Sequence, residues 1–298
     1  MKRMTGKQAK SHRIVTGTRG KFKTKLLHGL IASIINAIFL YLFMIMPRIF
    51  GKPDKEPHMG VLYAHRGLHD NDAGIPENSM KAFERAKEAG YGIELDVQLT
   101  RDGIPVIFHD FTLERMCGVS EKVENLTYEQ LNQLTLLNTD EKIPILKDFL
   151  DMVNGAVPLI VELKVEMTNL ALCPVVQGLL DDYKGVYCIE SFNPLVLLWY
   201  RVKRNEIMRG QLSTNFRLDG NYKTPLYFIL THLFTNFITA PDFIAYNCRF
   251  KNEPSRLICR KLYKNLAAAW TVKSQQELES IRDDFDLFIF DSFVPEEE

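Results

Sequence analysis

Two carboxylates and a histidine lie in the short stretch IELDVQLTRDGIPVIFHD (residues 93–110), whose apolar alternation is typical of a β-hairpin. Glu94 and Asp96 are two positions apart, so on an extended strand both side chains point to the same face. The pair Asp102–Gly103 is a strong turn signal, and a turn centred there would place His109 opposite Asp96. Because a hairpin needs none of these three groups in order to fold, we interpret them as candidates for chemistry.

Polar residues also follow two other apolar runs that we predict to be strands. The run at 61–65 ends with His65 and is followed by Arg66, while the run at 159–163 contains Glu162 and is followed by Lys164. In a barrel of parallel strands the carboxyl ends meet at one rim, where active sites form. The sequence therefore predicts two histidines, three carboxylates, an arginine and a lysine at one rim.

The three carboxylates, Glu94, Asp96 and Glu162, would repel one another at such a rim, and their pKa values would rise. A divalent cation would remove this repulsion. A ligand set made only of oxygen atoms favours Ca²⁺ or Mg²⁺ over Zn²⁺. Taken singly, such carboxylates are often solvated or salt-bridged. Together, on a strand whose other face is apolar, they predict a metal site.

The remaining rim residues fit a phosphodiester substrate. Arg66 can form bidentate hydrogen bonds to a phosphate, and Lys164 can supply a point charge. His65 and His109 flank the predicted metal site and could act as acid and base. The combination predicts metal-dependent phosphodiester cleavage.

Strand-like and helix-like segments alternate from residue 60 onward. Helix signals include residues 77–90, with Asn78 or Ser79 as N-cap and Gly90 beyond the end. Eight alternations predict a (β/α)₈ barrel, an α/β fold, with a hairpin excursion after the second strand. A doubly wound open sheet is the alternative, although the sequence has no Gly-rich phosphate fingerprint. The predicted strands are residues 61–65, 92–97, 159–163, 186–191, 207–212, 243–247, 266–272 and 286–290.

The charge of the chain is unevenly distributed. Residues 1–53 contain eleven Lys or Arg and no acid, which leaves 26 basic and 37 acidic residues after them and a net charge of −11 there. An acidic body argues against nucleic acid as a partner, because nucleic-acid binding relies on basic residues. The five scattered cysteines indicate core positions and neither a disulfide framework nor a zinc site.

An apolar run of twenty-one residues, 26–46, is long enough to cross a bilayer. A cleaved signal peptide and a buried helix are the alternatives, but the run is long for the former and its flanks are unlike core connections. Nine basic residues precede the run, which predicts a cytoplasmic N-terminus and an extracytoplasmic body in a single-pass cell-membrane protein. We thus expect a basic tail (1–25), a transmembrane helix (26–46), a linker (47–59) and the barrel (60–298).

The segments HRG, PENSMKAF and IELDVQLTRDGIPVIFHDFTLER, followed by IPILKDFL, VELK, ESFNP and WTV, resemble the glycerophosphodiester phosphodiesterase family over nearly all of residues 60–298. The resemblance implies a TIM barrel that cleaves glycerophosphodiesters to glycerol 3-phosphate and an alcohol. It also implies roles for the rim residues: Glu94, Asp96 and Glu162 as metal ligands, His65 and His109 as the acid–base pair, Arg66 and Lys164 at the phosphate, and Glu77 as a support. The chain departs from the family at FIFDSFVP, where Phe290 replaces a threonine while Asp291 is kept.

Residues 224–243 are apolar but interrupted by polar positions and Pro241. They fit either a barrel helix packed on the core or an interfacial helix that faces the bilayer. The second reading would suit lysophospholipids as substrates. We therefore expect a membrane-anchored glycerophosphodiester phosphodiesterase, with a lysophospholipase D-type enzyme and a catalytically silent membrane-tethered scaffold as the alternatives.

Overall fold

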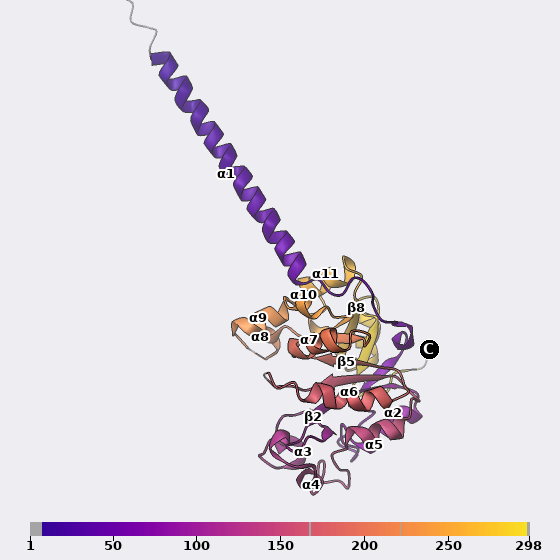
Figure 1. Ribbon diagram of the computed structural model, residues 1–298. Helices are drawn as coiled ribbons and strands as arrows, with labels where there is room; N and C mark the ends of the chain where they lie inside the picture. Colours follow the sequence, from indigo (N-terminus) through magenta and orange to yellow (C-terminus); the bar gives the residue numbers. More distant parts are fainter. Residues whose placement is uncertain (1–7, 167, 221, 297–298) are drawn as a thin grey trace, which may run out of the picture. The chain divides into compact units, whose positions relative to one another are not determined.

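The computed structural model describes residues 8–296 with gaps at 167 and 221, and side chains from Lys25 onward. The chain divides into two compact units, Met1–Met44 and Ile45–Glu298. The first contains the single helix α1, Gln8–Met44 (Figure 1). Within it, Lys25–Met44 is long and apolar enough to cross a membrane. This helix begins well before the apolar run and so includes much of the predicted basic tail.

The second unit is a closed barrel of eight parallel strands (Figure 1). Each of the eight predicted strand segments forms one of them, and β1 pairs with both β2 and β9, which closes the ring. The apolar runs are buried along nearly their whole length, as parallel strands covered by helices require. The barrel strands are β1 (Leu62–His65), β2 (Gly92–Leu99), β4 (Leu159–Leu163), β5 (Tyr187–Ser191), β6 (Arg209–Ser213), β7 (Phe243–Asn247), β8 (Leu266–Val272) and β9 (Leu287–Phe290).

Helices follow the strands and cover the barrel. Ser79 caps α2 by accepting a hydrogen bond from the backbone N–H of Ala82, as the sequence predicts. The segment 224–243 forms two short helices and not one long one. The helices of this unit are α2 (Met80–Glu88), α3 (Glu114–Cys117), α4 (Tyr128–Leu131), α5 (Leu146–Val153), α6 (Leu172–Asp182), α7 (Pro194–Lys203), α8 (Phe216–Asp219), α9 (Pro225–Thr231), α10 (Asn236–Thr239), α11 (Pro254–Lys261) and α12 (Gln275–Ile281).

A short strand, β3 (Pro105–Ile107), pairs antiparallel with the end of β2. Val97 faces Ile107 in this pairing, and the backbone N–H of Phe108 donates to Asp96 O, so Asp96 lies opposite Phe108 and not opposite His109. The expected two-residue turn is wrong by one position because the loop is wider. Thr100 Oγ1 accepts from the N–H of Ile104 across this loop.

A separate apolar cluster lies beside β3. It includes Val106, Phe108, Leu131 and Ile143, all nearly inaccessible to solvent. Residues between His109 and the start of α5 thus form a small module with its own core, which fixes the loop that carries His109.

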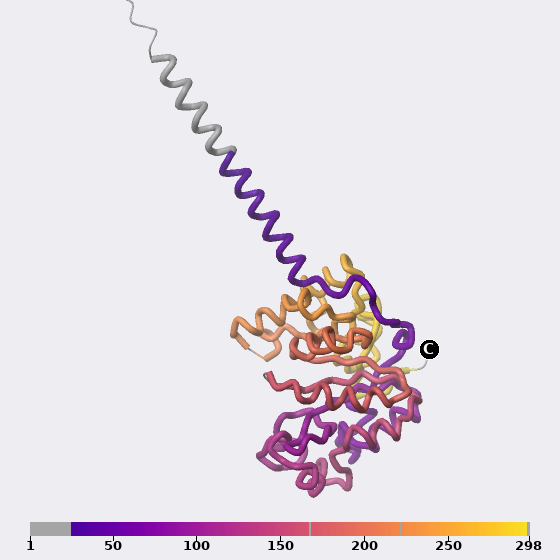
Figure 2. The backbone as a smooth tube through the Cα atoms, in the orientation of Figure 1, coloured from indigo at the N-terminus to yellow at the C-terminus, as the bar shows by residue number. Residues whose placement is uncertain are grey.

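Residues 45–59, which begin the second unit and include the predicted linker 47–59, run along the barrel (Figure 2) and hydrogen-bond to it. The carbonyl oxygen of Ile45 accepts hydrogen bonds from Asn236 Nδ2 (3.0 Å) and Cys259 Sγ (3.2 Å). The backbone N–H of Arg48 donates to Pro241 O (3.1 Å), and its guanidinium lies 3.4 Å from Asp242 Oδ1. The chain therefore enters the barrel unit beside α10 and α11.

Candidate active site

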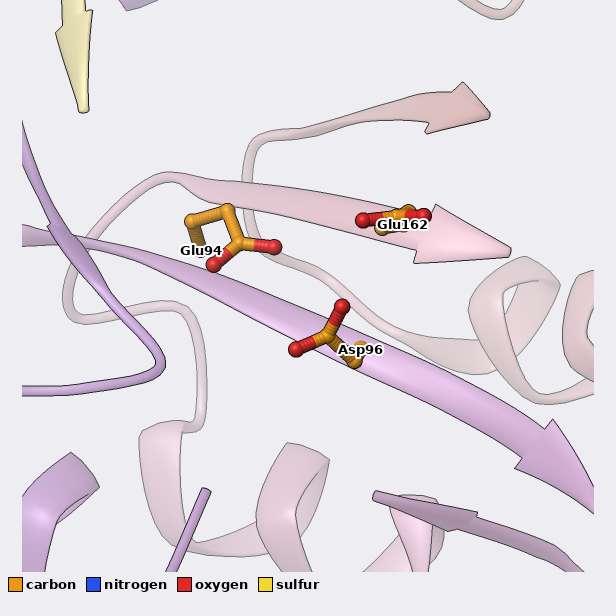
Figure 3. Close-up of side chains that lie close together, drawn as sticks. All are labelled: Glu94, Asp96 and Glu162. Atoms are coloured by element: carbon orange, nitrogen blue, oxygen red, sulfur yellow. The ribbon is translucent and has the colours of Figure 1, made fainter. Parts of the chain in front are cut away.

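Three buried carboxylates meet at the carboxyl end of the barrel (Figure 3). Glu94 and Asp96 are on one face of β2, and the β2–β4 register sets Asp96 beside Glu162. One oxygen from each residue lies within 4.8 Å of the others. The three residues are 1–7% exposed, so burial and crowding both disfavour three negative charges. An all-oxygen donor set of this kind fits a hard divalent cation such as Ca²⁺ or Mg²⁺.

Two cations balance part of this negative charge. Lys164 Nζ lies 3.2 Å from Glu162 and 3.4 Å from Asp96. Arg66 Nε lies 3.3 Å from Asp96, and the backbone N–H of Arg66 donates to Glu94 Oε2 (3.0 Å). Arg66 and Lys164, the two residues predicted to contact the phosphate, therefore both contact the carboxylate cluster.

The pKa values of the carboxylates separate according to their neighbours. Burial, then repulsion from Asp96, raises the pKa of Glu94 well above its usual value, and burial likewise raises the pKa of Glu162. Burial acts in the same direction on Asp96, but His109, Lys164 and Arg66 together hold the pKa of Asp96 well below its usual value. The expected rise in pKa therefore occurs at two of the carboxylates and is reversed at the third by these neighbours.

His65 is oriented by an aspartate from the last strand connection. His65 Nδ1 lies 3.1 Å from Asp291 Oδ2, and its Nε2 lies 4.0 Å from Glu94 Oε2. Asp291 Oδ1 also contacts His69 Nε2 at 3.2 Å. Burial, then the charge of Arg66, lowers the pKa of His65 to about 4, so its imidazole is neutral near pH 7. A neutral, oriented imidazole whose free nitrogen faces the carboxylates is suited to accept a proton.

His109 has a matching arrangement on the other side. Its Nδ1 lies 2.6 Å from Asp110 Oδ1, which leaves Nε2 for another partner. Arg115 donates to both Asp110 (2.6 Å) and Glu77 (2.7 Å), and Arg66 donates to the same Glu77 (2.7 Å). Burial alone would raise the pKa of Glu77, but its contacts with Arg115 and Arg66 lower this pKa to about 2. Glu77, predicted as a support, thus links the loops of both histidines.

Backbone geometry at two loops explains how these side chains are placed. Arg66 (φ 57°) and Gly67 (φ 80°) adopt left-handed conformations directly after β1. A Cβ at Gly67 would approach the backbone carbon of Ala82 to 2.8 Å, so only glycine fits against α2 here. Asn78, also left-handed (φ 55°), donates from Nδ2 to Asp96 Oδ2 at 2.9 Å.

All seven predicted site residues are at this rim, but other residues there were not predicted. Asp110 and Asn78 bind a predicted residue directly, and Asp110 could have been noticed as the residue after His109. Glu190 on β5 pairs in register with Glu162, and its pKa is raised well above the usual value by burial and by Glu162. Its alternation with Cys188 in the run YCIES was the available signal.

Comparison with known proteins gives a consistent family. The model of the glycerophosphoryl diester phosphodiesterase family matches residues 65–286. A curated glycerophosphodiester phosphodiesterase from Bacillus altitudinis is 39% identical over 102 residues, which cover 32% of this chain and 40% of that protein. The match therefore spans less than half the length of that relative.

Solved structures share the fold over most of the barrel. A phosphodiesterase from Oleispira antarctica, in complex with the product sn-glycerol-3-phosphate, aligns with a TM-score of 0.64 at 21% identity, over 78% of this chain and 93% of that one. A glycerophosphodiester phosphodiesterase from Thermotoga maritima aligns with a TM-score of 0.60 at 26% identity, over 78% and 95% of the two chains. The predicted TIM barrel is thereby confirmed.

Proposed function

This chain belongs to the glycerophosphoryl diester phosphodiesterase family, and we propose that it hydrolyses glycerophosphodiesters to glycerol 3-phosphate and an alcohol. The arrangement that carries the proposal is a pair of histidines, each bound through Nδ1 to an aspartate, at a rim that also holds three buried carboxylates. Fixed Nδ1 atoms leave both Nε2 atoms free for proton transfer.

We assign the metal ligands to Glu94, Asp96 and Glu162, and the ion to Ca²⁺ or Mg²⁺. Mutual proximity and burial of these groups support the assignment. Such an ion, when bound, supplies polarisation of a phosphoryl oxygen and balances phosphate charge.

The histidines have separate roles in the proposed reaction. His65, neutral and facing Glu94, accepts a proton from the attacking hydroxyl. His109, held by Asp110, donates a proton to the oxygen of the departing alcohol. Arg66 and Lys164 hold the phosphate at the rim. Their position supports this role, because both cations lie beside carboxylates that we propose as metal ligands.

Full-length protein in detergent micelles, incubated with glycerophosphocholine, tests the activity. We expect release of glycerol 3-phosphate that requires Ca²⁺ or Mg²⁺, stops with EDTA and is abolished by Glu94→Gln and by His65→Asn. Activity that survives either substitution would refute the site assignment. Absence of turnover in a folded protein that binds the metal would favour the scaffold alternative.

We also propose that residues 26–46 anchor the protein in the cell membrane, with the N-terminus cytoplasmic and the barrel outside. The exposed apolar side chains of Lys25–Met44 and the excess of basic residues before them support this topology. Protease added to sealed, right-side-out cells should digest the barrel and spare the N-terminal tail. The reverse pattern would overturn the topology.

A further inference from the structure

Two aromatic side chains, Phe192 and Trp270, lie near the carboxyl ends of β5 and β8. Inward positions alternate along each strand, and Phe192, directly after β5, follows Glu190 by two residues. Phe192 and Trp270, at the end of β8, both pack against the apolar cluster inside the barrel. Their rings meet edge to face, with centroids 5.5 Å apart. The carboxyl end of the barrel therefore carries an aromatic pair as well as the charged residues.

Ring contacts continue from this aromatic pair to the outside of the barrel. Phe192 contacts Phe216 at 6.1 Å, Phe216 contacts Tyr227 at 5.1 Å, and Tyr227 contacts Tyr222 at 4.6 Å between centroids. We call these five residues, from Trp270 to Tyr222, the aromatic track. Tyr222 and Tyr227 also line a cavity of about 420 Å³, to which Arg217 and Lys223 contribute. The ring contacts therefore run from the carboxyl end of the barrel to two residues that line a surface cavity.

The track ends at an unusually apolar surface. In the described part of residues 60–298, eleven large apolar side chains are exposed, and residues 216–240 contain six of them. This share far exceeds what one short segment would hold by chance, which indicates a surface that contacts something apolar. The six are Leu218, Tyr222, Leu226, Phe228, Ile229 and Ile238.

Polar contacts on its inner side hold this segment in place. Asp219 accepts hydrogen bonds from Thr214 (3.0 Å) and Asn247 (3.2 Å) and lies 3.5 Å from Arg249, so the only acid of residues 216–240 is already paired with other residues of the barrel unit. His232 Nδ1 lies 2.8 Å from Glu253 Oε1. The outward side keeps the apolar residues with Arg217 and Lys223, a combination that suits a bilayer containing anionic lipid.

The same segment binds the point where the chain enters the barrel unit. Asn236 of α10 donates to the carbonyl oxygen of Ile45, the residue directly after the candidate membrane span. The candidate span Lys25–Met44 thus ends one residue before the chain segment that α10 binds. Residues 216–240 therefore include the contact with Ile45, the six exposed apolar side chains and the outer end of the aromatic track.

We propose that residues 216–220 and 222–240 dock on the bilayer and that the aromatic track binds the hydrocarbon chain of a single-chain lipid phosphodiester. This inference rests on the proposed function and specifies its substrate class. Water would add at phosphorus, the bond from phosphorus to the head-group oxygen would break, and the head-group alcohol would leave with a proton. Acylated glycerol phosphate would remain, with its chain on the track.

Tryptophan fluorescence tests chain binding without any turnover. The protein has two tryptophans, so Trp199→Phe leaves Trp270, on the track, as the only emitter. With EDTA present, lysophosphatidylcholine brominated along its chain should quench this variant in nanodiscs, whereas Trp270→Phe, which keeps Trp199, should be quenched far less. Equal quenching of the two variants, or none of Trp270, would overturn the track whether or not the enzyme is active.

Exposed substitutions test the docking surface. In full-length protein reconstituted in liposomes, the double variant Leu226→Asp, Phe228→Asp should lower kcat/KM for lysophosphatidylcholine about tenfold or more, since two charges would face the bilayer. Turnover of soluble glycerophosphocholine should change less than about twofold. Val294→Asp, at an exposed apolar position outside the segment, is the matched control and should preserve both activities.

The two assays separate the failure of each idea. If neither substrate is turned over by the unmodified protein while Trp270 is still quenched, the proposed activity fails and the lipid site stands. If glycerophosphocholine is cleaved but the double variant handles both substrates as the unmodified protein does, the docking surface is refuted and the activity stands.

Discussion

His65 Nδ1 and Asp291 Oδ2 lie 3.1 Å apart although 226 positions separate the two residues in the chain. The contact exists because β1 and β9 are neighbours at the closure of the barrel. It fixes the imidazole so that Nε2 faces Glu94. The last strand therefore contributes to the site through orientation of a residue on the first.

Replacement of Asp291 by Asn should lower kcat roughly a hundredfold while KM changes little, because the imidazole loses the group that orients it. The Asp291 carboxylate also raises the pKa of His65. Removal of this carboxylate should therefore move the acid limb of the pH profile of kcat to lower pH. His69→Asn, which removes the other histidine bound to Asp291, is the control and should cost far less. An unchanged acid limb in Asp291→Asn would contradict a role through His65.

Replacement of Glu94 by Gln should have opposite effects on the metal-free and metal-bound protein. Burial and repulsion from Asp96 destabilise the Glu94 carboxylate, so a neutral isostere should raise the metal-free free energy of unfolding by about 1 kcal/mol. The same change should abolish the rise in Tm that Ca²⁺ or Mg²⁺ produces, because a ligand is lost. Thermal unfolding in micelles with EDTA and with each ion measures both effects.

Glu84→Gln is the control for this experiment, since Glu84 is exposed on α2. It should leave the unfolding temperature and the metal response unchanged. A Glu94→Gln protein that still gains stability from the ions would exclude Glu94 as a ligand.

The barrel could be predicted from the sequence because its strands are nearly continuous apolar runs and Ser79 marks a helix start. The rim site could be predicted as well, since alternation on a strand fixes which side chains face inward. The hairpin register could not. Asp102, expected in a tight turn, instead binds Thr100 Oγ1 (2.6 Å) and the N–H of Tyr128 (3.0 Å), and the second contact depends on the distant α4.

The partners of the site residues were equally beyond the sequence. Nothing local shows that Arg115 joins Glu77 to Asp110, because these contacts arise only when the module after β3 packs. Aromatic residues such as Phe216 and Tyr222 likewise form a track only after α8 and α9 fold back on the barrel. Contacts between distant elements require the tertiary structure that the sequence pattern only outlines.

His58 should make stability fall in mild acid. Its ring is buried, Nδ1 lies 2.7 Å from the Tyr63 hydroxyl, and burial lowers its pKa from 6.5 to about 4. Between these values the unfolded chain binds a proton that the folded protein does not. The contribution of His58 to the free energy of unfolding is therefore fully present above pH 6.5. It is lost as the pH falls toward 4, by up to roughly 3 kcal/mol.

Chemical unfolding of the unmodified protein and of His58→Gln at a series of pH values measures this contribution. The difference in their free energies of unfolding should shrink between pH 7 and pH 4, because Gln does not titrate. His65 has the same sign of shift and remains in both proteins, so its contribution cancels. A difference independent of pH would show that His58 does not carry the effect.

Gly67 should tolerate no side chain, and Gly103 provides a matched comparison. Both have φ 80°, but a Cβ at Gly103 meets nothing within 4 Å, whereas at Gly67 it would lie 2.8 Å from the backbone of Ala82. Gly103→Ala should cost about 1 kcal/mol of unfolding free energy from the backbone conformation alone. Gly67→Ala should cost at least about 2 kcal/mol, because the loop or α2 must also shift.

Such a shift would move Arg66, whose backbone N–H donates to Glu94, so kcat should fall in Gly67→Ala and stay near normal in Gly103→Ala. Equal losses of stability in the two variants would show that the loop after β1 is not packed tightly against α2.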